Sequence, residues 1–323
     1  MKAIAISEFG GPEVLTLREI ETPTIGDGDL LIQVVASGVN FIDIYQRQGV
    51  YPVELPYVLG MEGAGEVVAV GAGVSDFAIG DRVAWPMSPG SYAEVVAIAA
   101  DRVVRIPEDV DTDIAAASML QGMTAHYLTH STFNLDAGHT AVVHAAAGGV
   151  GQWLTQIAHW RGAKVIATVG SAEKAAIASG LGADEVISYD QVDDLAAAIR
   201  QANDGRGVDV VYDGVGAATF DAGLAALRPR GVMALFGAAS GQVPPLELQR
   251  LNAGGSLFVT RPSLAHHILT QSEMQWRADD IFSLVAAGSV QVNVFKGYEL
   301  AKAAEAQADL AARVTSGKLL LLP

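Results

Sequence analysis

The chain has 323 residues, no cysteine and a formal net charge of −16. The missing thiols exclude disulfides, thiolate nucleophiles, iron–sulfur clusters and thiolate-bound zinc, and the acidic balance argues against a nucleic-acid partner. No apolar run approaches the roughly 18 residues of a membrane-spanning helix, and the first ten residues lack the apolar stretch of a secretory signal. We therefore expect a cytoplasmic protein without a membrane partner.

The first third of the chain alternates short β-branched runs with Gly, Pro and Asp, a pattern typical of a mostly β domain. The runs are Leu30 to Val35, Gly65 to Val70, Arg82 to Trp85 and Tyr92 to Ile98. After Pro107 the pattern changes to Ala-rich helical stretches separated by short apolar strands, as in parallel βαβ units. These strands are expected at Thr140 to His144, Lys164 to Val169, Glu185 to Ser188, Val208 to Asp213, Val232 to Phe236 and Leu257 to Thr260. The pattern predicts an α/β fold with a doubly wound parallel (Rossmann) sheet.

The tail beyond Pro262 is expected to rejoin the first domain. Its expected elements are a helix near Glu273 to Ala287, a strand around Gln291 to Phe295, a helix from Glu299 to about Thr315 and a strand from Leu319 to Leu322. We therefore assign residues 1–120 and 262–323 to a catalytic and substrate domain, and residues 121–261 to a dinucleotide-binding domain. Ligands are expected in the cleft between the two domains.

A glycine turn follows the first strand of the parallel series. Ala146, Gly148 and Gly151 occupy the three positions of the dinucleotide pattern G-x-G-x-x-G. The absent side chain at Gly148 lets a pyrophosphate approach the backbone, and the helix N-terminus supplies N–H groups to it. A glycine cluster alone marks any tight strand-to-helix turn, but the surrounding βαβ series favours dinucleotide binding. The expected contacts are Ala147, Gly148, Gly149 and Val150.

The end of the second parallel strand indicates which dinucleotide binds. An NAD enzyme usually carries Asp or Glu there, whereas this strand ends in Gly170 and Ser171, with Lys174 one turn later. A neutral hollow with a nearby cation suits a 2′-phosphate, which favours NADPH. The alternatives are a solvated helix residue for Lys174 and a helix N-cap for Ser171.

Two N-terminal motifs resemble the core of the medium-chain dehydrogenase/reductase superfamily. They are Gly60-Met61-Glu62-Gly63-Ala64-Gly65-Glu66-Val67-Val68-Ala69-Val70-Gly71 and Gly80-Asp81-Arg82-Val83. In zinc-dependent members the residue at Met61 is a His ligand and the residue at Asn40 is a Cys ligand. Neither a thioether nor an amide is a credible substitute for these zinc ligands. The resemblance therefore implies a protein without a catalytic metal.

Further stretches resemble the zinc-free quinone oxidoreductase branch of that superfamily and span nearly the whole chain. They are Asn40 to Tyr45, Gln121 to Tyr127, the glycine turn, and Val259 to Pro262. The resemblance implies a GroES-like substrate domain beside the Rossmann domain, and a homodimer joined through the Leu257 to Thr260 edge strand. It also implies cofactor contacts at Asn40, Thr124, Gly170, Ser171, Lys174, Tyr189, Phe236 and Arg313. Each has a structural alternative: a turn for Asn40, strand packing for Tyr189, the core for Phe236 and a solvated helix end for Arg313.

The implied reaction is NADPH-dependent reduction of a quinone or a related small conjugated carbonyl compound. A quinone accepts hydride readily, so positioning dominates the catalysis. The candidate catalytic residues are Asn40, Asp43, Tyr45 and Tyr51. Either tyrosine could hydrogen-bond the quinone oxygen or relay a proton; alternatively both form a wall and solvent supplies the proton. Asp43 is expected to organise the site rather than to act as a base.

Two other functions remain open. One is an NADPH-dependent enoyl or enone reductase, because the zinc-free members include such enzymes and the hydride chemistry is alike. The other is a non-catalytic NADPH-binding redox sensor. His126 and His130 lie four residues apart on an expected helix, but the sequence offers no third ligand and lacks the Glu of H-E-x-x-H, so no metal site is expected there.

Overall fold

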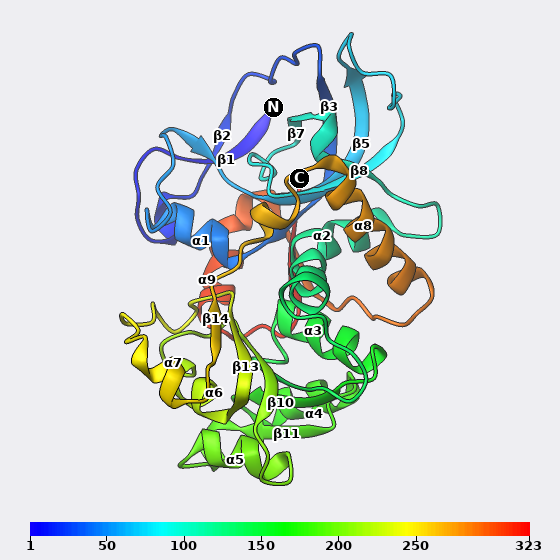
Figure 1. Cartoon of the computed structure of the whole chain (residues 1–323). Helices are drawn as coiled ribbons and strands as arrows, with labels where there is room; N and C mark the ends of the chain where they lie inside the picture. The colour runs from blue at the N-terminus through cyan, green and yellow to red at the C-terminus, as the bar shows by residue number, and fades with distance from the viewer. The chain divides into compact units, whose positions relative to one another are not determined.

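The computed structural model describes all residues from Met1 to Pro323. It contains two compact units, one formed by Met1–Met123 together with His267–Pro323 and the other by Thr124–His266 (Figure 1). The chain first passes from one unit to the other inside helix α2 (Thr112–Tyr127). None of the helices has both the length and the apolar character needed to span a bilayer.

The first unit contains a large sheet and a small one. The large sheet is ordered β15 (Val294–Glu299), β16 (Lys318–Leu322), β3 (Asp29–Val39), β5 (Glu62–Val70), β6 (Arg82–Pro86) and β8 (Val104–Arg105), and β7 (Val95–Ala99) also pairs with β3. All its pairings are antiparallel except that of β15 with β16. The small antiparallel sheet is ordered β2 (Thr16–Glu19), β1 (Lys2–Ile6) and β4 (Tyr57–Val58).

Strand β3 shows why this region forms a sheet. Leu30, Ile32 and Val34 are buried while Gln33 and Val35 are exposed, the period of two expected of a strand with one covered face. The buried side chains form a core with Val67, Val83, Trp85, Val96, Ile98 and Val103. A second core joins β1 to the tail of the chain through Ile4, Ile6, Leu59, Tyr92, Leu319 and Leu321. Burial of each large apolar side chain contributes about 1.5–3 kcal/mol.

Besides the start of α2, the first unit contains one long helix, α8 (Gln271–Ala286), and two short ones, α1 (Phe41–Arg47) and α9 (Ala303–Ala311). It also has 3-10 turns at Pro12–Val14, Ala100–Arg102 and Leu300–Lys302. Helix α8 begins with a capping box, in which Thr270 and Glu273 each accept a hydrogen bond from the other's backbone N–H. Helix α1 packs against α9, which places the residues after β3 beside the C-terminal tail.

The second unit is a single sheet of six parallel strands. Their order is β11 (Glu185–Ser188), β10 (Lys164–Val169), β9 (Thr140–His144), β12 (Val208–Asp213), β13 (Leu227–Leu235) and β14 (Phe258–Thr260). This order reverses direction between β9 and β12, as in a doubly wound fold. It confirms the expected α/β class, and four of the six strands have the expected bounds.

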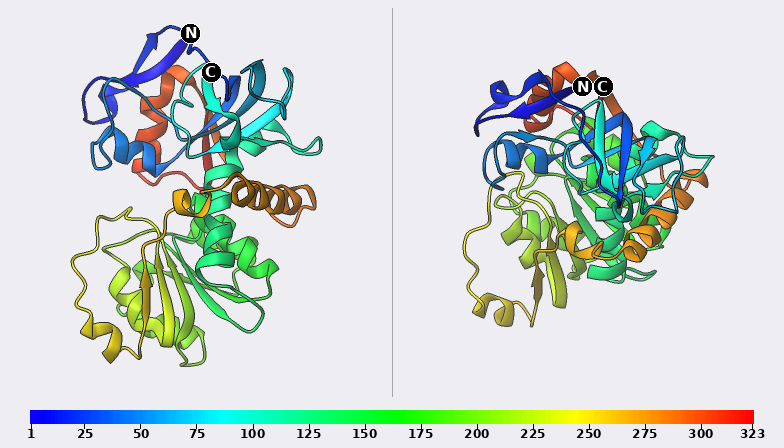
Figure 2. Two further views of the ribbon diagram at one scale, coloured as in Figure 1. Left: turned by 45° about the horizontal axis from the view of Figure 1, so that its top comes forward. Right: turned by 90° about the horizontal axis from the view of Figure 1, so that it is seen from above.

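Helices cover both faces of this sheet (Figure 2). They are α3 (Gly149–Trp160), α4 (Ala172–Gly180), α5 (Leu195–Ala202), α6 (Phe220–Ala226) and α7 (Gln249–Ala253), with 3-10 turns at Tyr189–Gln191 and Leu264–His267 and a π-helical turn at Leu128–Thr132. Helices α3 and α4 contact β9, β10 and β11, whereas α5 and α6 contact each other and β11, β12 and β13. Right-handed crossovers place these two pairs on opposite faces. The core between them includes Val142, Ile166, Ile199, Val211, Phe220 and Met233.

Some element boundaries differ from those expected. Strand β13 begins at Leu227 rather than at Val232, because Leu227 pairs with Val208 across a register shift. Strand β15 covers Val294–Glu299, rather than ending at Phe295, because it stays paired with β16 as far as Glu299. The following helix, α9, therefore begins at Ala303 rather than at Glu299, and it ends at Ala311 rather than near Thr315.

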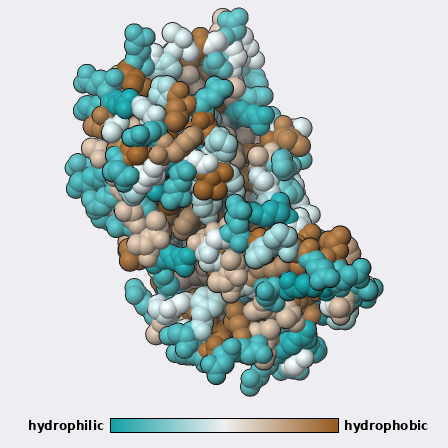
Figure 3. Space-filling model, turned by 90° about the vertical axis from the view of Figure 1, so that its left-hand side faces the viewer, coloured by the Kyte–Doolittle hydropathy of each residue, from teal (hydrophilic) through white to brown (hydrophobic).

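The surface combines hydrophilic and apolar side chains. On the face drawn in Figure 3, hydrophilic side chains predominate and small apolar groups lie between them. With 36 acidic and 20 basic side chains, such a surface repels polyanions.

Candidate functional site

In the first unit, the candidate residues surround the junction of β3 and α1. Asn40 is the N-cap of α1 and has an extended backbone. Its N–H group donates to Asp43 Oδ2 at 2.8 Å, and the N–H group of Asp43 donates to the Asn40 carbonyl at 3.1 Å. The segment Asn40-Phe41-Ile42-Asp43 therefore starts a helix, because Asp43 satisfies an N–H group that the helix itself leaves unpaired.

The carboxamide of Asn40 is saturated with hydrogen bonds inside the unit. Its Nδ2 donates to Glu62 Oε2 at 2.8 Å and to the Gly38 carbonyl at 3.3 Å. Its Oδ1 accepts from Lys318 Nζ at 2.9 Å and from Gln121 Nε2 at 3.5 Å. An amide has two donor hydrogens and two acceptor lone pairs. A cofactor or substrate could bond to this side chain only by displacing one of these four partners.

Sequence reasoning missed the ion pair that holds Asn40. Glu62 and Lys318 are bonded to each other, and their side chains are 0% and 2% exposed. Glu62 Oε1 also accepts from the Leu120 N–H group at 2.6 Å. A buried ion pair persists only when further hydrogen bonds compensate its lost hydration, and these contacts supply them. The local signal is a lysine that directly precedes the apolar run Leu319 to Leu322.

Asp43 faces the interior rather than an open site. It is fully buried, and Tyr92 Oη donates to its Oδ2 at 2.8 Å. Burial raises the pKa of Asp43 to about 7, although the hydrogen bonds from the Asn40 backbone and from Tyr92 oppose this shift. Burial and the neighbouring Asp43 also raise the pKa of Tyr92. Asp43 therefore joins the start of α1 to Tyr92 through hydrogen bonds, and its role in organising the site stays a prediction.

Tyr45 and Tyr51 form a partly exposed aromatic pair beside α1. Their rings meet edge to face with centroids 5.5 Å apart, and Tyr51 is 43% exposed. The Tyr51 N–H group donates to the Tyr45 carbonyl at 3.2 Å, and the ring of Phe41 lies 6.2 Å from that of Tyr45. The pair offers both an apolar ring face and hydroxyl groups, which suits a flat acceptor with a polar edge.

The two positions that correspond to zinc ligands are engaged elsewhere. Met61 is buried, and its Sδ accepts from Gln46 Nε2 at 3.4 Å and from Tyr57 Oη at 3.7 Å. Asn40 has the four partners described above. A catalytic zinc requires thiolate, imidazole or carboxylate ligands with an open fourth position. The thioether and the saturated amide do not fit that ion.

In the second unit, the glycine turn lies at the carboxyl end of β9. Ala145 has the left-handed φ of +53°, and Gly148 caps α3 with an extended backbone. A Cβ atom at Gly151 would lie 2.3 Å from the Ala145 carbonyl oxygen and 2.8 Å from the Ala146 Cα. At Gly148 its nearest neighbour would be the Ala145 oxygen, at 3.1 Å. Helix packing therefore requires a glycine at position 151 much more strictly than at position 148.

The start of α3 provides the donors of an anion site. The first N–H groups of a helix, here those of Gly149, Val150 and Gly151, have no partner within the helix. They lie at the carboxyl edge of a parallel sheet, where the strand order reverses between β9 and β12. Ligands of doubly wound folds bind at this switch point, and a helix N-terminus favours phosphate. The buried Ala147 immediately precedes the turn glycines.

Four further candidates gather at the ends of β10 and β11. Ser171 caps α4, and its Oγ accepts from the Lys174 N–H group at 3.3 Å, so the N-cap alternative is present in the structure. Tyr189 follows β11, and its hydroxyl lies 3.2 Å from the Ala145 nitrogen. Since Val169 and Ser188 are paired in register, Gly170 and Tyr189 leave the sheet side by side.

The remaining candidates are distributed over both units. Phe236 follows β13, and its N–H group donates to the Asp213 carbonyl at 2.8 Å, which also places it at the carboxyl edge of the parallel sheet. Thr124 is buried on α2. Arg313 belongs to the first unit, where it follows α9 with a left-handed φ of +58°. Most candidates thus form two groups, one around α1 and one at the edge of the parallel sheet, whereas Thr124 and Arg313 belong to neither group.

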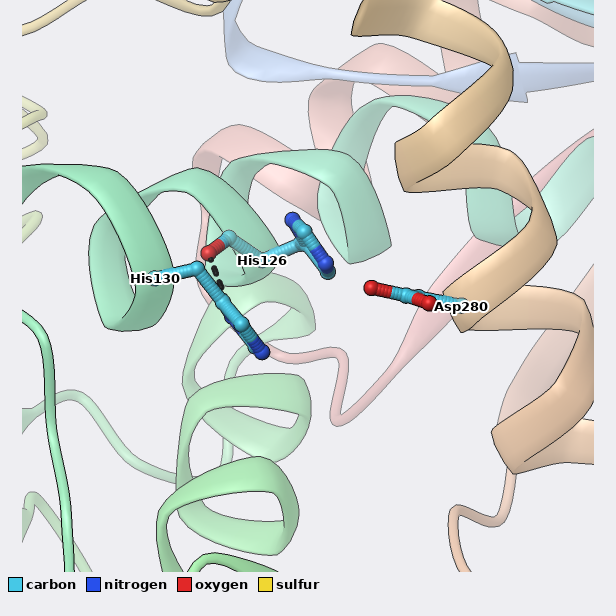
Figure 4. A group of neighbouring side chains, drawn as sticks. All are labelled: His126, His130 and Asp280. Atoms are coloured by element: carbon cyan, nitrogen blue, oxygen red, sulfur yellow. Dashed lines mark hydrogen bonds between the residues drawn. The ribbon is translucent and has the colours of Figure 1, made fainter.

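His126 in α2 and His130 in the following π-helical turn form a stacked pair (Figure 4). The rings of His126 and His130 lie 3.9 Å apart and are nearly parallel. His130 Nδ1 lies 2.9 Å from the His126 carbonyl oxygen, so it donates to that oxygen. His126 is fully buried. The expectation that this pair binds no metal stays a prediction.

Comparisons with known proteins agree with this architecture. Residues 26–108 match the alcohol dehydrogenase GroES-like domain family, and residues 149–282 match the zinc-binding dehydrogenase family. The chain is 42% identical to a quinone oxidoreductase of Pseudomonas aeruginosa, covering 100% of this chain and 99% of that protein. It is 39% identical to a 2-haloacrylate reductase of a Burkholderia species, covering 99% and 98%.

A solved structure extends the likeness to three dimensions. The Escherichia coli quinone oxidoreductase complexed with NADPH superposes on this chain with a TM-score of 0.97. The match covers 100% of both chains at 40% sequence identity. The expected GroES-like and Rossmann architecture is thereby confirmed.

Proposed function

Because the chain belongs to the quinone oxidoreductase branch of the medium-chain dehydrogenase/reductase superfamily, we propose that it transfers hydride from NADPH to quinones or related small conjugated carbonyl compounds. The observation that carries this proposal is the full-length likeness to quinone oxidoreductases, at 42% identity for the Pseudomonas protein. The retained glycine turn and the two-unit fold support it, because they provide a place for the hydride donor.

NADPH is the proposed cofactor, and the residues of the second unit fit it. The N-terminus of α3 can hold the pyrophosphate, with Ala147, Gly148, Gly149 and Val150 against it. Gly170, Ser171, Lys174 and Tyr189 supply hydroxyl groups and a cation, and none of these four residues is acidic, which suits a 2′-phosphate. Thr124, Phe236 and Arg313 remain proposed contacts. The bound nicotinamide supplies the hydride.

We propose that the reaction is independent of zinc. The family matched by residues 149–282 is named for zinc binding, but this chain has no cysteine. Met61 and Asn40 are engaged in hydrogen bonds within the first unit. A quinone needs no Lewis acid to accept hydride, so the protein needs only to orient the acceptor and admit a proton.

Tyr45 and Tyr51 are the proposed acceptor-binding residues. Their edge-to-face rings can hold a flat acceptor, and either hydroxyl can donate to a developing phenolate oxygen. Asn40 and Asp43 have no exposed polar atom to offer, since the Asn40 amide is saturated and Asp43 is buried. We therefore propose that these two shape the wall that supports the tyrosines rather than touch the reacting atoms.

An enoyl or enone reductase is the second candidate. The observation that favours it is the 39% identity, over 99% of the chain, to a 2-haloacrylate reductase. Haloacrylates, like enones, accept hydride at a carbon conjugated to a carbonyl group. The two functions therefore differ in the acceptor and not in the hydride donor.

One assay separates these functions. NADPH oxidation is followed by its near-ultraviolet absorbance with 1,4-benzoquinone, a naphthoquinone, an α,β-unsaturated ketone and 2-chloroacrylate, with NADH in parallel and with a chelator in a matched series. We expect quinone-dependent turnover with NADPH that the chelator does not reduce. Turnover confined to the ketone and the haloacrylate would instead favour the second candidate. Tight NADPH binding without any turnover would favour a sensor.

Quaternary structure, location and domain limits also remain proposals. Strand β14 pairs with β13 alone, and its Phe258 is 60% exposed. An unpaired apolar strand edge suits a homodimer contact. We expect Phe258→Glu to convert a dimer to a monomer in sedimentation experiments. The cytoplasmic location and the functional division into residues 1–120 with 262–323 and residues 121–261 stay predictions.

A further inference from the structure

Three polar side chains form a hydrogen-bonded series at the carboxyl edge of the parallel sheet, where NADPH is proposed to bind. Nδ1 of the buried His144, at the end of β9, lies 2.8 Å from Oγ1 of the buried Thr168 in β10. The same Oγ1 lies 2.7 Å from the hydroxyl of Tyr189, just after β11. The parallel register pairs Thr168 with His144 on one side and with Ile187 on the other. The three groups are therefore fixed by the sheet itself.

The surroundings of His144 decide which ring nitrogen carries the proton. Burial lowers the pKa of His144, so the ring is neutral near pH 7 and has one N–H group. Its Nε2 is buried and has no hydrogen-bond partner. It faces the backbone of Gly223, where an added Cβ would lie 3.3 Å away. A lone pair tolerates a C–H neighbour, whereas a buried N–H group without an acceptor loses its hydrogen bond to water. The proton therefore belongs on Nδ1.

This tautomer determines which group donates and which accepts in each hydrogen bond of the series. Nδ1–H donates to Thr168 Oγ1, so the single hydroxyl proton of Thr168 donates to the Tyr189 oxygen. That oxygen also accepts from the Ala145 N–H group at 3.2 Å. Since both inner neighbours are donors, the phenolic proton of Tyr189 points away from them. Tyr189 thus acts as a donor at the edge where β10 and β11 end.

We propose that His144 and Thr168 are positioning residues that hold the Tyr189 hydroxyl as a donor to the 2′-phosphate of NADPH, and so raise the preference for NADPH over NADH. This inference rests on the proposed NADPH-dependent function. The phosphate oxygens are acceptors, so they require a donor, and an oriented lone pair would repel them. A ribose 2′-hydroxyl can donate or accept and therefore tolerates either orientation.

The test measures the dissociation constants of NADPH and NADH by isothermal titration calorimetry. Thr168→Val keeps the shape of the side chain but interrupts the hydrogen bonds between His144 and Tyr189. His144→Leu removes the first donor of that series. We expect each to weaken NADPH binding by about three- to tenfold, within the usual range for the net contribution of one hydrogen bond, with NADH binding nearly unchanged. His144→Asn, whose amide can replace Nδ1, should restore much of the loss.

Two further variants separate positioning from general damage. Tyr212 lies in β12 of the same sheet, and its buried hydroxyl has no hydrogen-bond partner. Tyr212→Phe should therefore leave the ratio of the NADPH and NADH dissociation constants unchanged. In a Tyr189→Phe background, Thr168→Val should cause no additional loss, since both changes remove one interaction. Additive losses, or an unchanged ratio in Thr168→Val, would overturn the inference.

A spectroscopic measurement on the unmodified protein does not depend on variants that fold. The ¹⁵N chemical shifts of His144 should report protonation at Nδ1, and a proton on Nε2 would overturn the inference. The calorimetry also tests the underlying function separately. If the unmodified protein did not prefer NADPH, the cofactor assignment itself would fall. A preference that persists in Thr168→Val would remove only the role of the hydrogen-bonded series.

Discussion

Lys318 neutralises the buried carboxylate of Glu62 and also holds the oxygen of the Asn40 amide. Replacing it with an apolar residue would leave Glu62 without a cation in a dry environment. Loss of one partner of a buried pair typically lowers the free energy of unfolding by about 3–5 kcal/mol. We expect this loss in Lys318→Met, measured by urea denaturation. Lys302→Met, at an exposed position, is the matched control, and Lys318→Met combined with Glu62→Gln should recover part of the stability. A stable Lys318→Met protein would contradict the assigned pair.

Asp43 gives the first unit a characteristic dependence on pH. Its pKa is about 7 in the folded chain, against an ordinary value of 3.8. Between these values the folded state holds a proton that the unfolded state has released, so the free energy of unfolding falls as pH rises through this window. The contribution is complete below about pH 4 and absent above about pH 7. Asp43→Asn should flatten the difference in stability between pH 4.5 and 7.5, measured by urea denaturation. An unchanged slope would exclude Asp43 as its source.

Two glycines at the turn between β9 and α3 have different roles, because Gly151 is required for helix packing and Gly148 is proposed to contact the cofactor. In Gly151→Ala the new methyl group would meet the Ala145 carbonyl oxygen at 2.3 Å, which forces α3 away from β9. We expect a loss of about 1–3 kcal/mol, as for other overpacked sites. In Gly148→Ala the nearest atom lies at 3.1 Å, so the fold should persist while NADPH affinity falls. Thermal unfolding and calorimetry distinguish the two, and Gly180→Ala, with no atom within 4 Å, is the control.

The elements differ in how well the sequence predicts them. The bounds of β9, β10 and β12 were predicted because short buried parallel strands are apolar runs with clear breaks, and those of the edge strand β11 because its apolar pair Val186-Ile187 lies between polar residues. The bounds of β15 were wrong, because its exposed residues are held by pairing with β16 rather than by an apolar pattern. The glycine turn could be recognised because all its determinants are local. The partners of Asn40 could not, since Lys318 lies 278 residues away.

At the scale of the molecule, the two units should respond to acid in opposite directions. Burial lowers the pKa of His144 from its ordinary value of 6.5, so the unfolded state binds a proton more readily, and the second unit loses stability as pH falls below about 6.5. The first unit gains stability over the same range through Asp43. Hydrogen exchange corrected for intrinsic rates should show, from pH 7 to pH 5, more protection in β3 and less in β9. Parallel changes in both strands would contradict this assignment.

The pairing of Glu62 with Lys318 also has a consequence for biosynthesis. The two residues are separated by 256 positions, and the whole second unit is encoded between them. At translation rates of about 5–20 residues per second, Lys318 is synthesised about 13–50 s after Glu62. The second unit can fold in that interval from a continuous segment. The first unit must remain incomplete until the polypeptide carrying β16 has left the ribosome, so chaperones that recognise unfinished sheets would encounter it during this delay.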